Sequence, residues 1–258
     1  SIPAAGADFT LIYLGQQIVP TGMQFEGTTV GGLSSLDYIA ATGRYLAISD
    51  DRSDTDPARF YELTLDLSRF RRSNAPGMTG VTFRRVTTIR QPGGGPFAAR
   101  SVDPEGLRYD ARRNTIYWSN EGQRGSAGFQ NPTVREMSPD GSHVRDFAVP
   151  GHYRPFGSNG ALAAGDLGVR DNLGFESLAL STDGNTLYAA TENSLAQDGP
   201  AASAANGSRI RILSFNLATG LPAAEFAYDV EPVVAAPAVP FLLATNGLTD
   251  FVAIGDRQ

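Results

Sequence analysis

The chain has 258 residues, of which 41% are hydrophobic, and a formal net charge of −6. It has no cysteine and all 21 basic residues are arginine, which excludes disulfides, thiolate sites, Schiff-base lysines and a P-loop lysine. The acidic balance argues against a nucleic-acid partner, and two histidines cannot build a histidine-rich zinc or copper centre.

The first ten residues, SIPAAGADFT, do not form a signal sequence, and no apolar run is long enough to span a bilayer. They are compatible with a mature end left after removal of a signal peptide, or with a boundary of another origin. We therefore expect a periplasmic or secreted protein without a membrane span. The first predicted strand, FTLIYLGQQIV, covers residues 9–19.

Strand signals dominate the rest of the chain, as short Val, Ile, Tyr, Phe and Thr runs separated by Gly, Pro and Asn. One hairpin pattern recurs at intervals of 71, 71 and 73 residues when Ser34, Glu105, Glu176 and Thr249 are aligned. The three complete copies are GLSSLDYIAATGRYLAISDD (32–51), PEGLRYDARRNTIYWSNEG (104–122) and GFESLALSTDGNTLYAATEN (174–193). A fourth copy starts at residue 247 with GLTDFVAIGDRQ. Such a period indicates a repeated supersecondary unit.

Each complete copy is followed by two more strand-like runs, at 59–67 and 81–89, 132–138 and 143–150, and 209–217 and 223–230. Four antiparallel strands per repeat are typical of a β-propeller blade. We therefore predict an all-β fold with four-stranded antiparallel blades near 31–91, 101–150 and 172–232.

Three blades and the start of a fourth near residue 245 cannot close a ring, because propellers usually have four to eight blades. We expect residues 1–258 to form one incomplete β-propeller domain, the N-terminal portion of a longer ring. The strand at 9–19 is expected to close the last blade as its outer strand. The remaining C-terminal blades of the same protein are therefore an expected partner.

Each complete copy carries an acid sixteen residues after the aligned position, namely Asp50, Glu121 and Glu192. The two strands of a hairpin are antiparallel. The aligned residue and the acid sixteen residues later therefore lie at the same edge of the blade. The first strand is innermost, and that edge therefore rims the central channel. Glu105 is expected beside Glu121, and Glu176 beside Glu192, while Asp103 and Asp50 add further oxygens.

Carboxylates that converge on one channel mouth repel each other unless a cation or protons compensate. Calcium takes six to eight oxygen ligands, which suits such a cluster. We expect calcium to be held by Asp50, Asp103, Glu105, Glu121, Glu176 and Glu192. Two alternatives remain: the acids cap backbone N–H groups in turns, or they were copied with the blade and have no function.

The chain resembles the bacterial "esterase-like activity of phytase" family. The motifs that carry the resemblance are, in chain order, VGGLSSLDY, YLAISDDRS, ARFYELTLDL, DPEGLRYD, VREMSPDGS, NLGFESLALSTDGNTLYAATEN and RIRILSFNLATG. They cover most of the chain. The resemblance implies a phytase-like propeller and gives less guidance on the reaction.

A more distant similarity is to the β-propeller phytases, six-bladed calcium-dependent phosphatases. Their D-x-E-G segment is similar to residues 103–106, and their pair of glutamates sixteen apart is similar to Glu176 and Glu192. The similarity implies six blades and calcium ions that bind phosphate and activate water. Two departures put phytase activity in doubt: the D-x-E-G blade precedes the Glu–Glu blade here, and the phosphate-binding lysines are missing.

Arg52 and Arg124 each follow a second-strand acid and are candidates for bidentate phosphate binding, or for pairing with those acids. A serine-hydrolase triad is disfavoured because the sequence places no histidine near Ser34, Ser35 or Ser177. We expect His152 to be a loop residue rather than a general base.

The leading hypothesis is a calcium-dependent hydrolase that acts on a small, possibly phosphorylated, ester at the channel mouth. Glu176 and Glu192 are the catalytic candidates, because either carboxylate could orient the attacking water. One alternative is a lactone or carboxylic-ester hydrolase in which calcium polarises the carbonyl oxygen. Another is a non-enzymatic propeller that calcium only braces.

Overall fold

A computed structural model describes residues 10–126, 128–235 and 244–255 of the chain. Strands and isolated β-bridges make up 41% of the described residues, and no α-helix occurs among them. Two single-turn 3₁₀ helices, η1 (Leu67–Arg69) and η2 (Gly151–Tyr153), lie in connections. Among the described residues, no helix has the length and apolar character needed to cross a membrane.

Three four-stranded antiparallel sheets form the body of the molecule. The first contains, from its inner to its outer edge, β3 (Leu33–Ile39), β4 (Arg44–Ser49), β5 (Arg59–Leu65) and β6 (Val81–Thr88). The second contains β7 (Pro104–Asp110), β8 (Thr115–Asn120), β11 (Thr133–Met137) and β12 (His143–Asp146). The third contains β13 (Phe175–Leu180), β14 (Thr186–Thr191), β15 (Ser208–Asn216) and β16 (Pro222–Val230).

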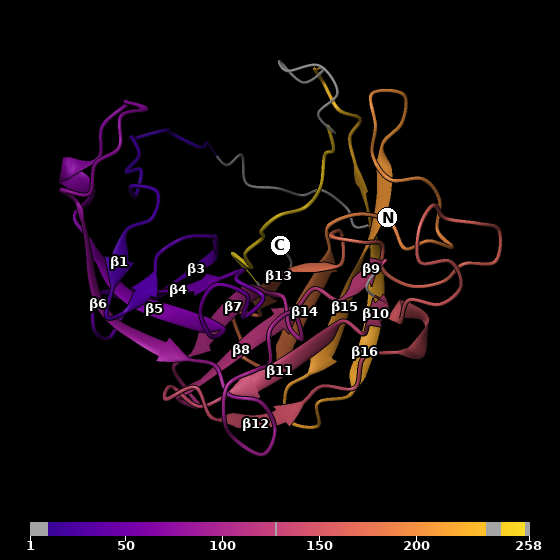
Figure 1. The fold of residues 1–258 in the computed structure, drawn as a ribbon, viewed down its shortest axis with the longest axis horizontal. Helices are drawn as coiled ribbons and strands as arrows, with labels where there is room; N and C mark the ends of the chain where they lie inside the picture. The colour runs from indigo at the N-terminus through magenta and orange to yellow at the C-terminus, as the bar shows by residue number, and fades with distance from the viewer. Residues whose placement is uncertain (1–9, 127, 236–243, 256–258) are drawn as a thin grey trace.

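The sheets fan out around a common axis, with β3, β7 and β13 innermost and β6, β12 and β16 outermost (Figure 1). Strand β7 contacts both β3 and β13, so the three inner strands line one central wall. This arrangement confirms the predicted all-β propeller class. The division of residues 1–258 into blades of one incomplete ring stays a prediction.

Two hairpins were missed by the sequence analysis: β1 (Gln24–Phe25) with β2 (Thr28–Thr29), and β9 (Gln123–Gly125) with β10 (Gly128–Gln130). Their strands have only two or three residues, too few for an alternating pattern to be recognised. The first lies before β3, and the second lies in the long connection from β8 to β11.

Apolar side chains fill the spaces between neighbouring sheets. Trp118 is 1% exposed and meets Phe97 edge to face, with ring centroids 5.9 Å apart. Phe147 contacts Tyr117 at 5.7 Å and Phe215 at 5.3 Å, which joins the second sheet to the third. Edge-to-face aromatic pairs stabilise beyond their buried area. Trp118 is therefore a core residue, and this packing holds the inner strands in a fixed relation.

The expected strand at 9–19 is not formed by residues 10–19, and residue 9 lies outside the described part. Two isolated antiparallel bridges, Gln16 to Arg71 and Ile18 to Gly77, join this segment to the connection between β5 and β6. A Cβ on Gly15 would lie 2.7 Å from the backbone nitrogen of Arg71. The proposed closure of a last blade by this segment stays a prediction.

Residues 244–255 form no regular strand, although the fourth repeat copy begins here. Leu248 nevertheless occupies the place that the repeat assigns to it. Its N–H donates to the carbonyl oxygen of Glu192 at 3.1 Å, as the N–H of Phe175 donates to that of Glu121 at 3.4 Å. Figure 1 shows this yellow segment next to the inner strands. The same backbone hydrogen bond thus joins the fourth copy to the third and the third copy to the second.

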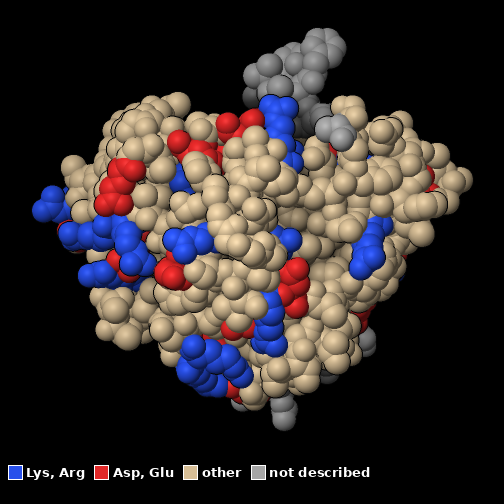
Figure 2. Space-filling view, turned by 60° about the horizontal axis from the view of Figure 1, so that its bottom comes forward, with Lys and Arg blue, Asp and Glu red and all other residues tan. Residues whose placement is uncertain are grey.

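Charged side chains on the outer surface lie in small groups of mixed sign. On the face shown in Figure 2, arginines and acids are interspersed among larger areas of uncharged residues. Opposite charges that lie this close compensate each other locally. The acids at the channel mouth form a different arrangement.

Candidate metal centre

A β-bulge at the start of each inner strand directs one side chain to the channel mouth. In β13, Phe175 lies opposite Thr191 and Ser177 opposite Ala190, which leaves Glu176 without a partner on β14. A bulge bends the strand and changes the direction of the extra side chain. This local geometry explains why Glu176 faces the mouth and not one face of the sheet.

The same irregularity occurs in the other two sheets. In β3 the register shifts between Leu33 and Ser35, so Ser34 is the extra residue. In β7 it shifts between Pro104 and Leu107, a stretch that includes Glu105. The aligned positions of the sequence repeat are therefore the bulge positions of the three blades.

The second acid of each hairpin directly follows the second strand and is fixed by one backbone hydrogen bond. The N–H groups of Asp50, Glu121 and Glu192 donate to the carbonyl oxygens of Gly32, Asp103 and Gly174 at 2.7, 2.9 and 2.7 Å, respectively. This bond closes the hairpin just before the bulge. The sixteen-residue spacing therefore brings both acids to one edge.

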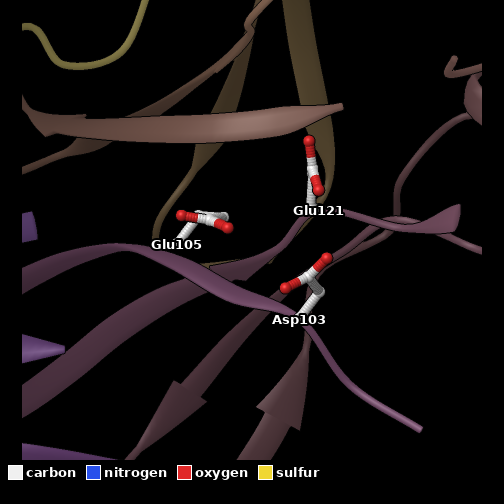
Figure 3. A group of neighbouring side chains, drawn as sticks. All are labelled: Asp103, Glu105 and Glu121. Atoms are coloured by element: carbon white, nitrogen blue, oxygen red, sulfur yellow. The ribbon is translucent and has the colours of Figure 1, made fainter. Parts of the chain in front are cut away.

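The acids assemble into two groups of three that share Glu121. The first is Asp103, Glu105 and Glu121, with candidate ligand oxygens within 4.8 Å of one another (Figure 3). The second is Glu121, Glu176 and Glu192, at the same spacing. Figure 3 shows the three carboxyl groups of the first group around one common space.

The first group is buried and its hydrogen bonding is incomplete. Glu121 is 1% exposed and Glu105 is 7% exposed, yet one oxygen of each, Oε2, has no hydrogen-bond partner. A buried charged oxygen without a partner is strongly unfavourable. The site therefore requires protons or a cation.

Protons compensate the charge when no cation is present. Burial, followed by the charge of Glu176, raises the pKa of Glu105 to about 9. Burial, followed by the charge of Glu192, raises the pKa of Glu176 to about 8. Burial, followed by the charges of Asp103 and Glu105, raises the pKa of Glu121 well above its usual value. These are the shifts expected for desolvated, mutually repelling carboxyls.

An open pocket of about 330 Å³ connects the acids to solvent. Its lining residues are Ser34, Asp50, Arg52, Asp54, Asp103, Glu105, Asn172 and Glu176. Asp50, an expected ligand, lies in this pocket but outside both groups of three. Glu192 belongs to the second group and is not among the pocket-lining residues.

Arg52 reaches the acids from the end of β4. Its Nη2 lies 2.5 Å from Oδ2 of Asp103 and 3.9 Å from Oε2 of Glu121, and it donates to Oδ1 of Asn172 at 3.0 Å. The contact with Asp103 is an ion pair. It lacks the alignment of a hydrogen bond, and Oδ2 of Asp103 therefore has no hydrogen-bond partner. The side chain of Arg52 remains 30% exposed. Arg52 thus contacts the acids and also lines the pocket.

Arg124, the other expected phosphate ligand, lies in a different environment. Its side chain is 2% exposed, and Nε donates to the carbonyl oxygen of Val169 at 3.1 Å. Its terminal nitrogens donate to the carbonyl oxygens of Phe156, Ser158 and Leu167. These bonds hold the loop before β13 and use the donors that a phosphate would need. The phosphate-binding role expected of Arg124 stays a prediction.

The donor set fits a hard divalent cation. Both groups offer only carboxylate oxygens, which is the chemistry that calcium prefers. The alternative role as turn caps accounts for one oxygen: Oε1 of Glu121 accepts from the N–H of Gly174 at 3.0 Å. The other oxygen of Glu121 points into the group without a partner. Capping alone therefore does not explain this arrangement.

The histidines lie on or beside outer strands. Nε2 of His152 is 2.8 Å from Glu225 on β16, and Nε2 of His143 on β12 is 3.8 Å from Asp146. The serines considered for a triad, such as Ser34, lie on inner strands. The candidate catalytic groups at the channel mouth are therefore the carboxylates.

Residues 28–258 match the Phytase-like family, described as "esterase-like activity of phytase". The chain belongs to this family. The resemblance drawn from the sequence motifs is therefore confirmed. A comparison with curated proteins gave no match.

Solved structures match this phytase-like chain at low identity and with low TM-scores. The periplasmic gluconolactonase of Pseudomonas aeruginosa is 12% identical, with a TM-score of 0.40, and the match covers 86% of this chain and 62% of that one. A putative 6-phosphogluconolactonase from Bacteroides uniformis is 12% identical, with a TM-score of 0.33 and coverage of 77% and 58%. The hydrazine synthase of Kuenenia stuttgartiensis is 12% identical, with a TM-score of 0.39 and coverage of 76% and 38%. The phytase-like chain spans less than two thirds of each of these three chains.

Two features of the site were missed by the sequence analysis. Asn172 orients Arg52, and the bulges place Ser34, Glu105 and Glu176. Asn172 is the first residue of the motif NLGFESLALSTDGNTLYAATEN, but nothing in that motif indicated a contact with Arg52. The aligned repeat positions were the available signal for the bulges. A one-residue register shift, however, cannot be recognised from amino-acid composition.

Proposed function

We propose that the chain is a calcium-dependent hydrolase of the phytase-like family that acts on phosphoric esters at the channel mouth. The observation that supports it is the pair of three-carboxylate groups sharing Glu121, with buried oxygens that lack partners. Family membership supports a hydrolase. The periplasmic or secreted location expected from the first residues is a proposal as well.

Asp103, Glu105 and Glu121 would hold one calcium, and Glu121, Glu176 and Glu192 a second. Bound there, a divalent cation polarises an ester or phosphoryl oxygen and lowers the pKa of water. Asp50 lines the same pocket as Asp103 and Glu105 and would add negative charge there.

Glu176 is the candidate general base. It is half-buried and lines the pocket, and its carboxyl therefore reaches both the acids and an incoming substrate. Without a cation, burial and the charge of Glu192 raise the pKa of Glu176 to about 8; a calcium ion held beside it would lower that pKa and leave an ionised carboxylate that could accept a proton from water. Glu192 raises that pKa by its charge and so acts as a positioning residue for Glu176.

Arg52 supports an anionic substrate. It is the basic residue among the described pocket-lining residues, and its planar guanidinium suits two phosphate oxygens. Asn172 accepts a hydrogen bond from Nη2 and limits the orientation of the guanidinium.

A carboxylic ester or a lactone is the second candidate substrate. Five of the eight lining residues are acids and one is basic, so the pocket itself repels a doubly charged phosphate unless cations are present. A neutral ester meets no such repulsion.

A substrate panel tests the proposal: a phosphomonoester, a phosphodiester, a lactone and a carboxylic ester, each assayed with calcium and with a chelator. We expect turnover of a phosphoric ester that the chelator abolishes. Glu121→Gln should lose it, whereas Glu231→Gln, an exposed acid after β16, should retain it. Chelator-sensitive turnover of the lactone or carboxylic ester alone would favour the second candidate. Calcium binding without any turnover would favour a calcium-braced binding propeller.

A further inference from the structure

We propose that Arg52 is an internal counter-ion, which occupies the cation position between Asp103 and Glu121 until a metal ion displaces it into the pocket. The inference rests on the proposed function, since it requires a metal at these acids. It adds a specific role for Arg52: linking metal binding to the capture of an anion.

The contacts of Arg52 place one positive charge where the first acid group needs it. Nη2 is 2.5 Å from Asp103, and the 3.9 Å to Glu121 is too long for a hydrogen bond. The guanidinium therefore compensates Asp103 and leaves Oε2 of Glu121 without a partner. A single cation with fixed, planar donors satisfies this group only in part.

Arg52 also has room to leave. It is 30% exposed, while Asp103 is 5% exposed, so the arginine approaches the acid from the solvent side. Its backbone is held in place because its carbonyl oxygen accepts from the N–H of Arg100 at 2.7 Å. Rotation of the side chain alone would move the guanidinium from Asp103 into the pocket.

Glu176 and Glu192, the two acids that only the second group contains, have no such counter-ion in the described part of the chain. Within the described ranges, no arginine forms an ion pair with Glu176 or Glu192, whereas Arg52 pairs with Asp103. A metal ion can therefore join the second group without displacing a side chain. Entry to the first group brings two positive charges to the same carboxylate edge, and their repulsion expels Arg52.

A displaced Arg52 faces the substrate. Ser34 and Asn172 line the same pocket, and a phosphate group there could accept hydrogen bonds from both terminal nitrogens of Arg52. Metal binding thereby creates the anion site, and anion binding must in turn tighten the metal, since coupling between two ligands is reciprocal.

Calorimetry with calcium on the whole chain tests the exchange. We expect Arg52→Gln to bind calcium about tenfold more tightly than the wild type, because a competing charge is removed. Arg52→Lys keeps the charge and should stay within about threefold of the wild type. Arg100→Gln is the matched control: Arg100 pairs with Asp54 at the rim and is 73% exposed, so its loss should leave the affinity unchanged.

A second arm uses inorganic phosphate as the probe. Calcium should raise phosphate affinity in the wild type and in Arg100→Gln, but not in Arg52→Gln. Equal calcium affinity in Arg52→Gln and the wild type, or phosphate binding that calcium does not change, would overturn the inference. Absence of calcium binding in the wild type would instead overturn the proposed function.

Chemical modification of the wild type avoids any effect of a substitution on folding. Phenylglyoxal labels accessible arginines, and mass spectrometry quantifies each labelled peptide. Labelling at Arg52 should rise when calcium is added without phosphate, while labelling at Arg100 stays constant. Unchanged or reduced labelling at Arg52 would contradict its displacement.

Discussion

The N–H of Gly174 donates a hydrogen bond to Oε1 of Glu121 at 3.0 Å, so the third sheet orients the carboxylate that both acid groups share. The contact is possible because Gly174 has no side chain: a Cβ there would lie 2.1 Å from the carbonyl oxygen of Glu121. The candidate site and the packing of two blades thus depend on the same residue pair. Blade packing is therefore coupled to the geometry of the metal centre.

Gly174→Ala should destabilise the protein and weaken calcium binding, because the added methyl group forces the two sheets apart. Overpacking of this kind costs about 1–3 kcal/mol. Differential scanning calorimetry and calcium titration measure the two effects. Gly160→Ala is the control, since a Cβ at Gly160 meets nothing within 4 Å. Gly174→Ala with wild-type melting and wild-type calcium affinity would contradict the coupling.

The metal-free protein should lose stability as the pH rises. Glu105 and Glu176 have a reference pKa of 4.5, and in the folded chain about 9 and about 8. Between these limits the folded state binds more protons than the unfolded state, so the free energy of unfolding falls with rising pH. The contribution of these two groups to the free energy of unfolding should therefore be highest below pH 4.5 and should decline until about pH 9.

Urea unfolding in the presence of a chelator, from pH 5 to pH 9, measures this slope. Glu105→Gln and Glu176→Gln should each flatten it, while Glu231→Gln should not. Calcium should reverse the trend, because its binding requires ionised carboxylates and becomes tighter as the pH rises. A metal-free protein whose stability is constant over this range would show that these acids ionise freely.

The repeat made much of the fold predictable. Its 71-residue period and the antiparallel hairpins predicted the inner strands and placed Glu105 near Glu121, because strand pairing follows from local pattern. The run at 9–19 has the composition of a strand. Residues 10–19 form none, because strand formation depends on a partner edge and only isolated bridges are made here.

The different environments of the two arginines could not be predicted from the sequence. Arg52 and Arg124 both follow a second-strand acid within three residues. The loop before β13 folds back over Arg124 and surrounds it with carbonyl oxygens, whereas no such loop covers Arg52. This difference arises from long-range contacts, which a local motif does not encode.

Glu121→Gln should abolish most calcium binding, because the substitution removes the one ligand that both groups share. Asp50→Asn, outside both groups, should weaken binding by less than about tenfold through loss of nearby charge. In the wild type a chelator should lower the melting temperature, since a ligand that binds only the folded state stabilises it. Glu121→Gln should show no such shift. Retention of the calcium-dependent shift in Glu121→Gln would place the metal elsewhere.

Arg124→Gln should loosen the loop before β13 without altering calcium affinity. The buried guanidinium donates to four carbonyl oxygens, those of Phe156, Ser158, Leu167 and Val169. Each loses a charge-assisted partner in the variant, and the expected loss of stability is about 2–4 kcal/mol.

Limited proteolysis should then cut the chain between residues 154 and 170 faster in Arg124→Gln than in the wild type, because local opening exposes the loop backbone. Arg154→Gln, a substitution at an exposed arginine in the same loop, serves as the control. Calcium titration separates this role from substrate or metal binding. If Arg124→Gln kept wild-type stability and lost phosphate binding, the loop-holding role would be wrong and the phosphate role expected from the sequence would be supported.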